Sequence, residues 1–245
     1  GDKKVIVGVS GGVDSTVVAA LLHKAIGENS ISVMIDHGLL RKNEALNCVQ
    51  ALQKGLGLNI KSYDESDLFL SKLKSITAPE KKRKIIGNEF IYSFERISKS
   101  LGEVEYLAQG TLYPDIVESG FSKSKKAHVI KSHHNVGGLP EKMDFELIEP
   151  LKELFKDEVR KVGLELGLPP FLVNRHPFPG PGLGVRIIGE INESRIKILQ
   201  EADQIYMDIL IEDELYDDIW QAFAVLIPIK TCLLYTSTLP TMFEV

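Results

Sequence analysis

A short segment rich in glycine and hydroxyl groups, SGGVDS at residues 10–15, has the residue types of a phosphate-binding loop. Backbone N–H groups at a helix N-terminus carry partial positive charge, and Gly11 and Gly12 let a phosphate oxygen come close to the backbone. Serine and threonine hydroxyls can add further donors. We therefore expect seven consecutive residues to contact a nucleotide: Ser10, Gly11, Gly12, Val13, Asp14, Ser15 and Thr16.

Asp14 indicates which kind of phosphate site this loop forms. The segment lacks the Lys-Ser/Thr ending of a Walker A motif, and it does not match G-x-G-x-x-G. A carboxylate beside a polyphosphate repels it unless a cation lies between them, and Mg²⁺ suits this place because it prefers oxygen ligands. We predict that Asp14 is catalytic and binds Mg²⁺ together with ATP. The alternative is a tight turn in which Asp14 only stabilises the first turn of a helix.

The residues around the loop predict the elements that position it. Residues 5–9, VIVGV, have the apolar, β-branched pattern of a strand buried on both faces. Helical spacing follows over residues 17–25, and Gly27 is placed to cap that helix at its C-terminus. A second strand is expected at 31–36 and a helix at 43–56. The alternation continues with a strand at 58–63, a long helix at 86–97 and a strand at 106–108. This order predicts a doubly wound parallel α/β domain.

The second half of the chain is less regular. Residues 110–146 lack periodicity and collect Gly, Ser, Lys and His, so we interpret them as long loops. The elements expected after them are a helix at about 156–166, a proline-rich segment at 176–182, a helix capped by Asn192 and a strand at 221–229. We assign residues 1–170 to the α/β domain and residues 171–245 to a smaller, truncated α+β domain.

The overall composition restricts location and partners. The chain has 29 basic and 34 acidic side chains, and its net charge of −5 provides no general attraction for nucleic acid. Two cysteines argue against a disulfide framework, and no apolar run approaches the roughly 18 to 20 residues of a membrane span. The chain opens without a signal-peptide pattern. We expect a cytoplasmic protein that binds neither nucleic acid nor membrane.

Residues 10–15 match the signature of the PP-loop ATP pyrophosphatases, which include NAD synthetases, argininosuccinate synthetases, tRNA-thiolating enzymes and GMP synthases. Other blocks resemble the synthetase part of the glutamine-hydrolysing GMP synthase family. These blocks are DHGLLR (36–41), KRKIIG (82–87), QGTLYPD (109–115), KSHHNVGGLP (131–140), LIEPLKELFKDEVR (147–160) and HPFPGPGL (176–183) with Arg186. The resemblance runs from residue 1 to about residue 230. It implies an adenine nucleotide alpha hydrolase-like fold.

The resemblance also implies a two-step reaction. The 2-oxygen of XMP attacks the α-phosphorus of MgATP and releases pyrophosphate, and ammonia then displaces AMP from adenyl-XMP to give GMP. In this family a glutamine amidotransferase supplies the ammonia, and Cys48, expected mid-helix, is no candidate for its nucleophile. The implied partners are therefore XMP, ammonia, an amidotransferase domain or subunit, and a second copy in a homodimer of the full-length protein.

Three residues are expected near the phosphates in addition to the loop. By resemblance, Lys156 reaches the ATP phosphates and stabilises charge, and we assign it and Asp157, at the start of the same helix, as catalytic. Asp36 ends a strand at the carboxyl edge of the sheet, where ligands of such folds bind, and is assigned to the nucleotide. The alternatives are a capping role for Asp36 and a solvated helix start for Lys156 and Asp157.

Four further residues are assigned to substrate or catalysis. Arg83 offers paired donors to the XMP phosphate, although a charge run is more often a solvated helix face. Lys131, as a catalytic residue, and His133, as a substrate ligand, lie in a glycine-flanked loop of lid character. Arg186 follows the proline-rich loop and is assigned to substrate, with a structural ion pair as the alternative.

The end of the chain departs from the family pattern. Residues 231–245, TCLLYTSTLPTMFEV, match none of the family's C-terminal segment, which completes the XMP pocket. The expectation is that this chain binds MgATP but forms GMP poorly. Two alternatives stay open: another PP-loop ATP pyrophosphatase such as NAD synthetase, and a catalytically incomplete nucleotide-binding fragment.

Overall fold

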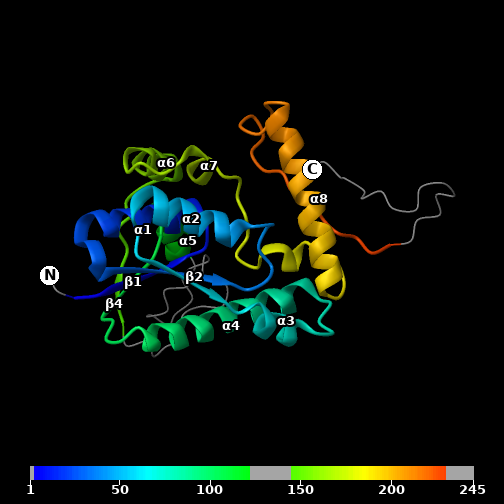
Figure 1. The fold of residues 1–245 in the computed structure, drawn as a ribbon, viewed down its shortest axis with the longest axis horizontal. Helices are drawn as coiled ribbons and strands as arrows, with labels where there is room; N and C mark the ends of the chain where they lie inside the picture. Colours follow the sequence, from blue (N-terminus) through cyan, green and yellow to red (C-terminus); the bar gives the residue numbers. More distant parts are fainter. Residues whose placement is uncertain (1–2, 122–144, 230–245) are drawn as a thin grey trace.

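A five-stranded parallel sheet forms the centre of the computed structural model, which describes residues 3–121 and 145–229 (Figure 1). The spatial order is β3-β2-β1-β4-β5, and every neighbouring pair is parallel. The strands are β1 (Val5–Val9), β2 (Ser30–Asp36), β3 (Ile60–Asp64), β4 (Tyr106–Ala108) and β5 (Glu146–Ile148). This confirms the doubly wound α/β fold.

Helices cover both faces of the sheet. They are α1 (Val13–Ile26), α2 (Glu44–Leu56), α3 (Ser66–Leu73), α4 (Pro79–Ser100), α5 (Tyr113–Phe121), α6 (Lys156–Glu165), α7 (Pro170–Val173) and α8 (Glu193–Glu212), with short 3₁₀ turns at Gly27–Asn29 and Gly182–Val185. Figure 1 shows α1, α2, α6 and α7 on one face and α3 and α4 on the other. Each face has its own apolar core, one around Val17 and Leu52 and one around Phe69 and Phe94.

The strand order places the crevice for a ligand. The chain leaves β1 toward β2 and β3 on one side, and returns to place β4 and β5 on the other side. Ligands of such sheets bind outside the carboxyl ends of the strands at this reversal. The loop after β1 and the loop after β4 meet there: a Cβ atom on Gly110 would lie 3.0 Å from Asp14 Cβ.

Local sequence explains why β1, the loop and α1 follow one another. Four of the five residues of β1 are buried, as expected for a central parallel strand. Gly12 is the N-cap residue of α1, and Gly27 ends the helix with a positive φ of 58° and an N–H bonded to His23 O. The predicted strand and helix are both confirmed.

The part after residue 170 packs on the same core as the sheet. Asn192 caps α8 as predicted, its Oδ1 accepting the N–H of Arg195 at 2.9 Å. Ile196 and Leu199 of α8 join the core on the α3–α4 face of the sheet. The predicted strand at 221–229 is wrong, because within the described part of the chain it makes a single bridge, Leu226 to Ile187. The domain boundary at residue 170 stays a prediction.

The expectation of long loops over 110–146 is wrong in part. Helix α5 begins at Tyr113, and Asp115 Oδ2 accepts the N–H of Leu112 at 2.8 Å at its start. Its apolar Ile116 and Val117 remain exposed, so no clear buried stripe marked this helix in the sequence. Residue 146 opens β5, an edge strand that pairs with β4. No helix in the described ranges is long and apolar enough to cross a membrane.

Candidate active site

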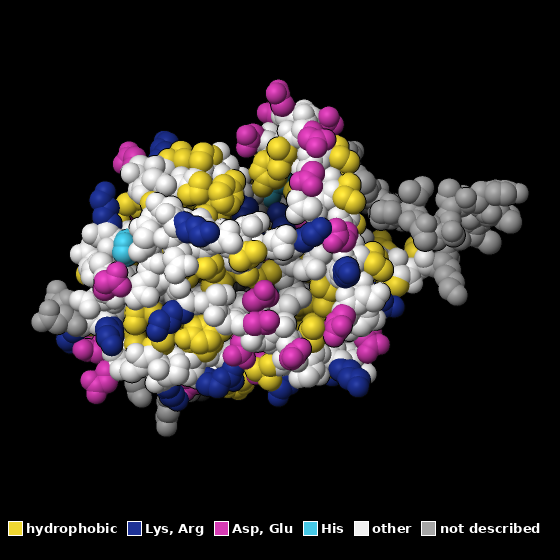
Figure 2. Space-filling model, viewed as in Figure 1, with side chains coloured by type: hydrophobic (Ala, Val, Ile, Leu, Met, Phe, Trp, Pro, Cys, Tyr) yellow, Lys and Arg dark blue, Asp and Glu magenta, His cyan; other side chains and the backbone are white. Residues whose placement is uncertain are grey.

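A cavity of about 410 Å³ opens at the carboxyl ends of β1 and β4. Its wall combines the loop after β1, residues 109–111 after β4, one face of α4, the start of α6 and the proline-rich segment. A smaller hollow adjoins it and shares Arg160, His176 and Trp220 with it. Figure 2 shows a recess between the α6–α7 side and the end of α8. The cavity size is typical of a small-molecule site.

The hydroxyl groups of the glycine loop bond mainly to the loop itself. Ser15 Oγ donates to Gly12 O at 3.1 Å and accepts the N–H of Ser10 at 3.2 Å. Thr16 Oγ1 donates to the same Gly12 carbonyl at 2.8 Å, and Thr16 is fully buried. The Thr16 hydroxyl therefore stabilises the start of α1 in this structure. Ser10 is exposed, and Gly12, Val13, Asp14 and Ser15 join it on the cavity wall.

Asp14 and Lys156, 142 residues apart in sequence, form the central ion pair of the site. The Lys156 ammonium lies 2.7 Å from both Asp14 carboxylate oxygens. Asp14 stands in the first turn of α1 and Lys156 is the first residue of α6, so the two helix starts meet at the cavity. Asp157, predicted beside them, is exposed and is absent from the described cavity wall. The structure thus joins two of the predicted catalytic residues.

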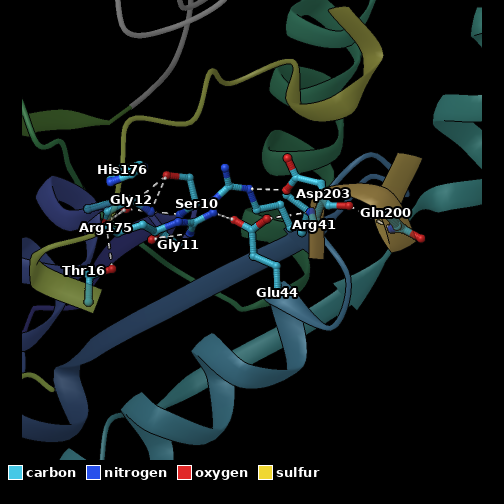
Figure 3. Close-up of polar contacts among 12 residues, drawn as sticks. Ser10, Gly11, Gly12, Thr16, Arg41, Glu44, Arg175, His176, Gln200 and Asp203 are labelled. Atoms are coloured by element: carbon cyan, nitrogen blue, oxygen red, sulfur yellow. Dashed lines mark hydrogen bonds and ion pairs between the residues drawn. The ribbon is translucent and has the colours of Figure 1, made fainter. Parts of the chain in front are cut away.

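The sequence did not predict a role for two arginines that lie on the cavity wall. Arg160 lies one turn after Lys156 on α6, and its buried Nε has no hydrogen-bond partner within the described ranges. Arg175 donates from Nη1 to Gly11 O at 2.8 Å and pairs through Nη2 with Glu44 (Figure 3). The spacing of four residues from Lys156 was an available signal for Arg160. No signal in the sequence marked Arg175, because its contacts are all with residues distant in sequence.

Asp36 lies at the end of β2, as predicted, but its carboxylate serves the backbone. Oδ1 accepts the N–H of Gly38 at 2.8 Å, and burial raises the pKa of this carboxyl. Its neighbour His37, not Asp36, appears on the described cavity wall. The capping alternative accounts for these contacts, and a role for Asp36 in nucleotide binding stays a prediction.

The predicted substrate residues lie in different surroundings. Arg83 forms a two-point contact with Glu80 on the surface of α4, at 2.9 and 2.8 Å, and the cavity wall as described does not include it. Its neighbour Lys82 is fully buried and donates to Ile187 O at 2.6 Å, so this charge run is only partly a solvated face. Lys131 and His133 lie outside the described residues.

Arg186 is buried in a structural ion pair. Its Nη1 lies 3.8 Å from Asp203 Oδ1, and its guanidinium stacks over the ring of Phe223 at 4.2 Å. Burial and the nearby Arg41 lower its pKa to about 10. This matches the ion-pair alternative, and contact with substrate stays a prediction.

His37 provides a neutral polar group in the cavity wall. Its Nδ1 accepts the N–H of Leu39 at 3.1 Å, and the side chain is almost completely buried. Burial lowers the pKa of His37 to about 4, so the imidazole is uncharged at neutral pH. The lysine and arginine side chains of the described wall are Lys156, Arg160 and Arg175.

The amino-acid sequence of this chain is similar to the sequences of known proteins. Residues 1–90 match the family model described as NAD synthase. The chain is 58% identical over 231 residues to "GMP synthase [glutamine-hydrolyzing]" of Teredinibacter turnerae, covering 94% of this chain and 44% of that protein. It is 57% identical over 235 residues to the protein of the same name from Thermosipho africanus, covering 94% and 46%. The chain is homologous to part of the glutamine-hydrolysing GMP synthases.

The similarity covers only part of each relative, because the chain spans less than half the length of these GMP synthases. Among solved structures, NMN synthetase from Francisella tularensis superposes with a TM-score of 0.53 at 15% identity, over 89% of this chain and 84% of that one. That likeness establishes the fold alone. Together the matches show that this chain shares sequence with part of these GMP synthases and, over residues 1–90, with the NAD synthase family model.

The arrangement is suited to binding and cleaving a nucleoside triphosphate. The start of α1 lines a cavity whose wall also includes Lys156 and Arg160. Such preorganised positive groups stabilise charge that develops on phosphoryl oxygens. Asp14 is the one carboxylate in the described part of the wall.

Proposed function

We propose that this chain binds MgATP at residues 10–16 and uses it to aminate XMP to GMP. The 2-oxygen of XMP attacks the α-phosphorus of ATP and pyrophosphate leaves, and ammonia then replaces AMP on adenyl-XMP. The observation that carries the proposal is 55–58% identity to GMP synthases across 94% of the chain. The enzyme class is a ligase that forms a C–N bond.

The residues of the chain have distinct parts in the first step. The loop N–H groups and Lys156 hold the β- and γ-phosphates and offset the charge that pyrophosphate gains as it leaves. Asp14 accepts the Lys156 ammonium through both oxygens, which fixes the direction in which this cation points. Arg160 supplies a second cation one turn along α6.

Magnesium is proposed as the companion of ATP. Proteins usually hold Mg²⁺ through one or two carboxylates together with substrate phosphates. Asp14 fits this pattern as a part-exposed carboxylate on the cavity wall, beside the loop that receives the phosphates. Each of its oxygens accepts Lys156 with one lone pair and keeps a second one for a metal ion. The ion would supply charge neutralisation between the phosphates and this carboxylate.

XMP is proposed to occupy the side of the cavity formed by α4, the proline-rich segment and Trp220. This wall is largely apolar, with Phe90, Ile91, Phe178 and the exposed Trp220, and so suits a flat purine ring. Five residues stay proposed contributors on the strength of the sequence: Arg83, His133, Lys131, Asp157 and Arg186.

The ammonia, the assembly and the location are part of the same proposal. Glutamine hydrolysis is in the printed name of the relatives, so we propose that an amidotransferase domain or subunit supplies the ammonia to this chain. Exposed Ile198, Ile205 and Ile209 on α8 support a homodimer of the complete protein. The reaction is placed in the cytoplasm, with no nucleic acid or membrane as partner.

One experiment separates this function from its alternatives. Pyrophosphate release by the purified chain is measured with MgATP and ammonium, in the presence of XMP, of deamido-NAD, or of neither. The proposal expects pyrophosphate release and GMP formation only when XMP is present, at the low rate that the sequence predicts for this chain. NAD synthetase activity, which the family match over residues 1–90 favours, would give release with deamido-NAD instead. Binding of ATP without release under any condition identifies a catalytically incomplete fragment.

A further inference from the structure

Four buried charged residues connect the glycine loop to α8 in an unbroken series of contacts. We call this series the arginine relay, and its members in order are Arg175, Glu44, Arg41 and Asp203. At one end Arg175 contacts the loop, and at the other end Asp203 stands on α8 (Figure 3). Their side chains are between 2% and 13% exposed, so these contacts are shielded from water.

The first contact fixes one peptide of the glycine loop. Arg175 Nη1 donates to Gly11 O at 2.8 Å. In a planar trans peptide the C=O and the following N–H point in opposite directions, so this bond turns the N–H of Gly12 away from Arg175. That N–H points toward Ser10 Oγ, 3.4 Å away on the cavity wall. Two adjacent glycines leave this peptide free to rotate, and Arg175 removes that freedom.

Glu44, on α2, fixes the orientation of the Arg175 guanidinium. Its Oε1 pairs with Arg175 Nη2, and its Oε2 accepts the backbone N–H of Arg41 at 2.7 Å. A carboxylate with both oxygens engaged has a single orientation, and Glu44 is the first residue of α2. The guanidinium of Arg175 is therefore fixed relative to the helix that covers the sheet.

Asp203 fixes the far end on α8. Its Oδ2 lies 3.0 Å from Arg41 Nε, and its Oδ1 accepts the N–H of Ala224 at 3.0 Å. The ring of Phe178, a cavity-wall residue, faces the guanidiniums of Arg41 and Arg175 at 5.0 and 5.4 Å. The relay thus joins the glycine loop, the proline-rich segment and α8 in one buried network.

We propose that Arg175 is a positioning residue for the phosphates of ATP, and that Glu44, Arg41 and Asp203 hold it in place. Docking of α8 and formation of the phosphate-binding loop are then coupled, because the loop peptide takes its orientation from contacts that end on α8. Arg175 acts through the Gly11 peptide and does not itself take part in the chemistry. The inference rests on the proposed binding of ATP.

The test measures MgATP affinity and loop order in conservative variants of the whole chain. Arg175→Lys can replace one of the two contacts, and Glu44→Gln keeps the shape while removing the charge that anchors Arg175. Each is expected to weaken MgATP binding by about tenfold, the effect of losing one charge-assisted hydrogen bond. Asp203→Asn is expected to weaken it by about threefold, as a more distant member of the network.

Hydrogen exchange distinguishes positioning from general loosening. The backbone amides of residues 11–15 are expected to exchange faster in Glu44→Gln, while those in the middle of α1 keep their wild-type rates. A matched control is Glu201→Gln, which breaks the pair between Glu201 on α8 and Lys42, 2.6 Å apart, and leaves the relay intact. Its MgATP affinity is expected to stay within about twofold of wild type.

The outcomes separate the relay from the proposed function. If the wild-type chain fails to bind MgATP, the proposed function itself is lost. If the wild type binds and Glu44→Gln binds equally well with unchanged exchange at residues 11–15, the relay is overturned. An equal loss of affinity in Glu201→Gln also contradicts it, because that result indicates general weakening of the α8 contact. Where Arg175→Lys fails to fold, Glu44→Gln decides.

Discussion

The ammonium of Lys156 lies 2.7 Å from each carboxylate oxygen of Asp14, so the start of α6 and the glycine loop meet through one ion pair. The pair is partly open to the cavity, with side-chain exposures of 42% and 22%. Exposed pairs of this kind contribute only about 0 to 1 kcal/mol to stability. The main effect of the pair is therefore to position the Lys156 ammonium beside the glycine loop.

Replacement of Lys156 by alanine is expected to slow pyrophosphate release by about 10²- to 10³-fold, as for the loss of one preorganised donor. The effect should fall on kcat more than on the KM for ATP, because the charge on the leaving pyrophosphate grows toward the transition state. Steady-state pyrophosphate release with XMP and ammonium measures both constants.

The control for Lys156→Ala is Lys161→Ala, an exposed lysine on the same helix. It removes the same charge from α6 and should leave kcat and KM unchanged. A Lys156→Ala chain that retains more than about a tenth of wild-type kcat would contradict the assigned role.

Arg160→Ala is expected to weaken binding of MgATP and of magnesium pyrophosphate by about 10- to 100-fold, the range for a lost hydrogen bond to a charged group. The reason is that Arg160 lies on the cavity wall one turn after Lys156, where its guanidinium can bind phosphate oxygens. The melting temperature should change little, since the Nε of Arg160 makes no hydrogen bond within the described part of the chain. Calorimetric titration of both ligands checks the affinities, and unchanged affinity together with a lower melting temperature would give Arg160 a structural role.

The sequence predicted the first βα unit of the site well. The apolar run of β1, the glycine turn and Gly27 at the end of α1 are all local signals, and the structure confirms each. A strand buried on both faces needs no information from elsewhere in the chain. The position of the loop at the sheet edge followed from this alone.

Contacts between distant segments could not be read from residue spacing. The spacing alone did not show that Asp14 and Lys156 meet, and Arg175 was missed because its partners Gly11 and Glu44 are more than a hundred residues away. Residues 221–229 have a strand-like composition, but a strand forms only where a partner strand is available, and Leu226 makes a single bridge. Tertiary packing decided these features.

Gly11→Ala is expected to destabilise the fold and to weaken MgATP binding. Gly11 has a φ of +76°, and an added Cβ would lie 2.8 Å from Arg175 Nη1 and 3.3 Å from Glu44 Oε1. Strained backbone of this kind costs about 1 to 3 kcal/mol, before the displaced arginine is considered. Urea unfolding and ATP titration measure the two effects.

Gly12→Ala is the matched variant for stability. Gly12 has a φ of −72°, which any residue adopts, and its added Cβ would meet only Ser10 Oγ at 3.4 Å. Its free energy of unfolding should lie within about 1 kcal/mol of wild type. Equal destabilisation by the two substitutions would show that the conformation of Gly11 is unimportant.

His37 is expected to make the stability of the chain depend on pH between about 4 and 6.5. Burial lowers its folded-state pKa to about 4 from the ordinary value of 6.5, so in this window the unfolded state binds a proton that the folded state does not. The stability is therefore fully present above pH 6.5 and decreases as the pH falls toward 4. The maximum loss is about 3 kcal/mol, the equivalent of the whole pKa difference.

His37→Asn removes this titration while keeping an acceptor near the position of Nδ1 for the N–H of Leu39. Free energies of unfolding are measured in urea at several pH values from 4 to 7 for the wild type and the variant. All other titrating groups are common to both chains, so the difference between the two curves reports His37. The wild-type curve should be steeper by up to one proton, about 1.4 kcal/mol per pH unit. Parallel curves would mean that His37 is protonated in the folded chain or exposed to water, and either result contradicts its burial.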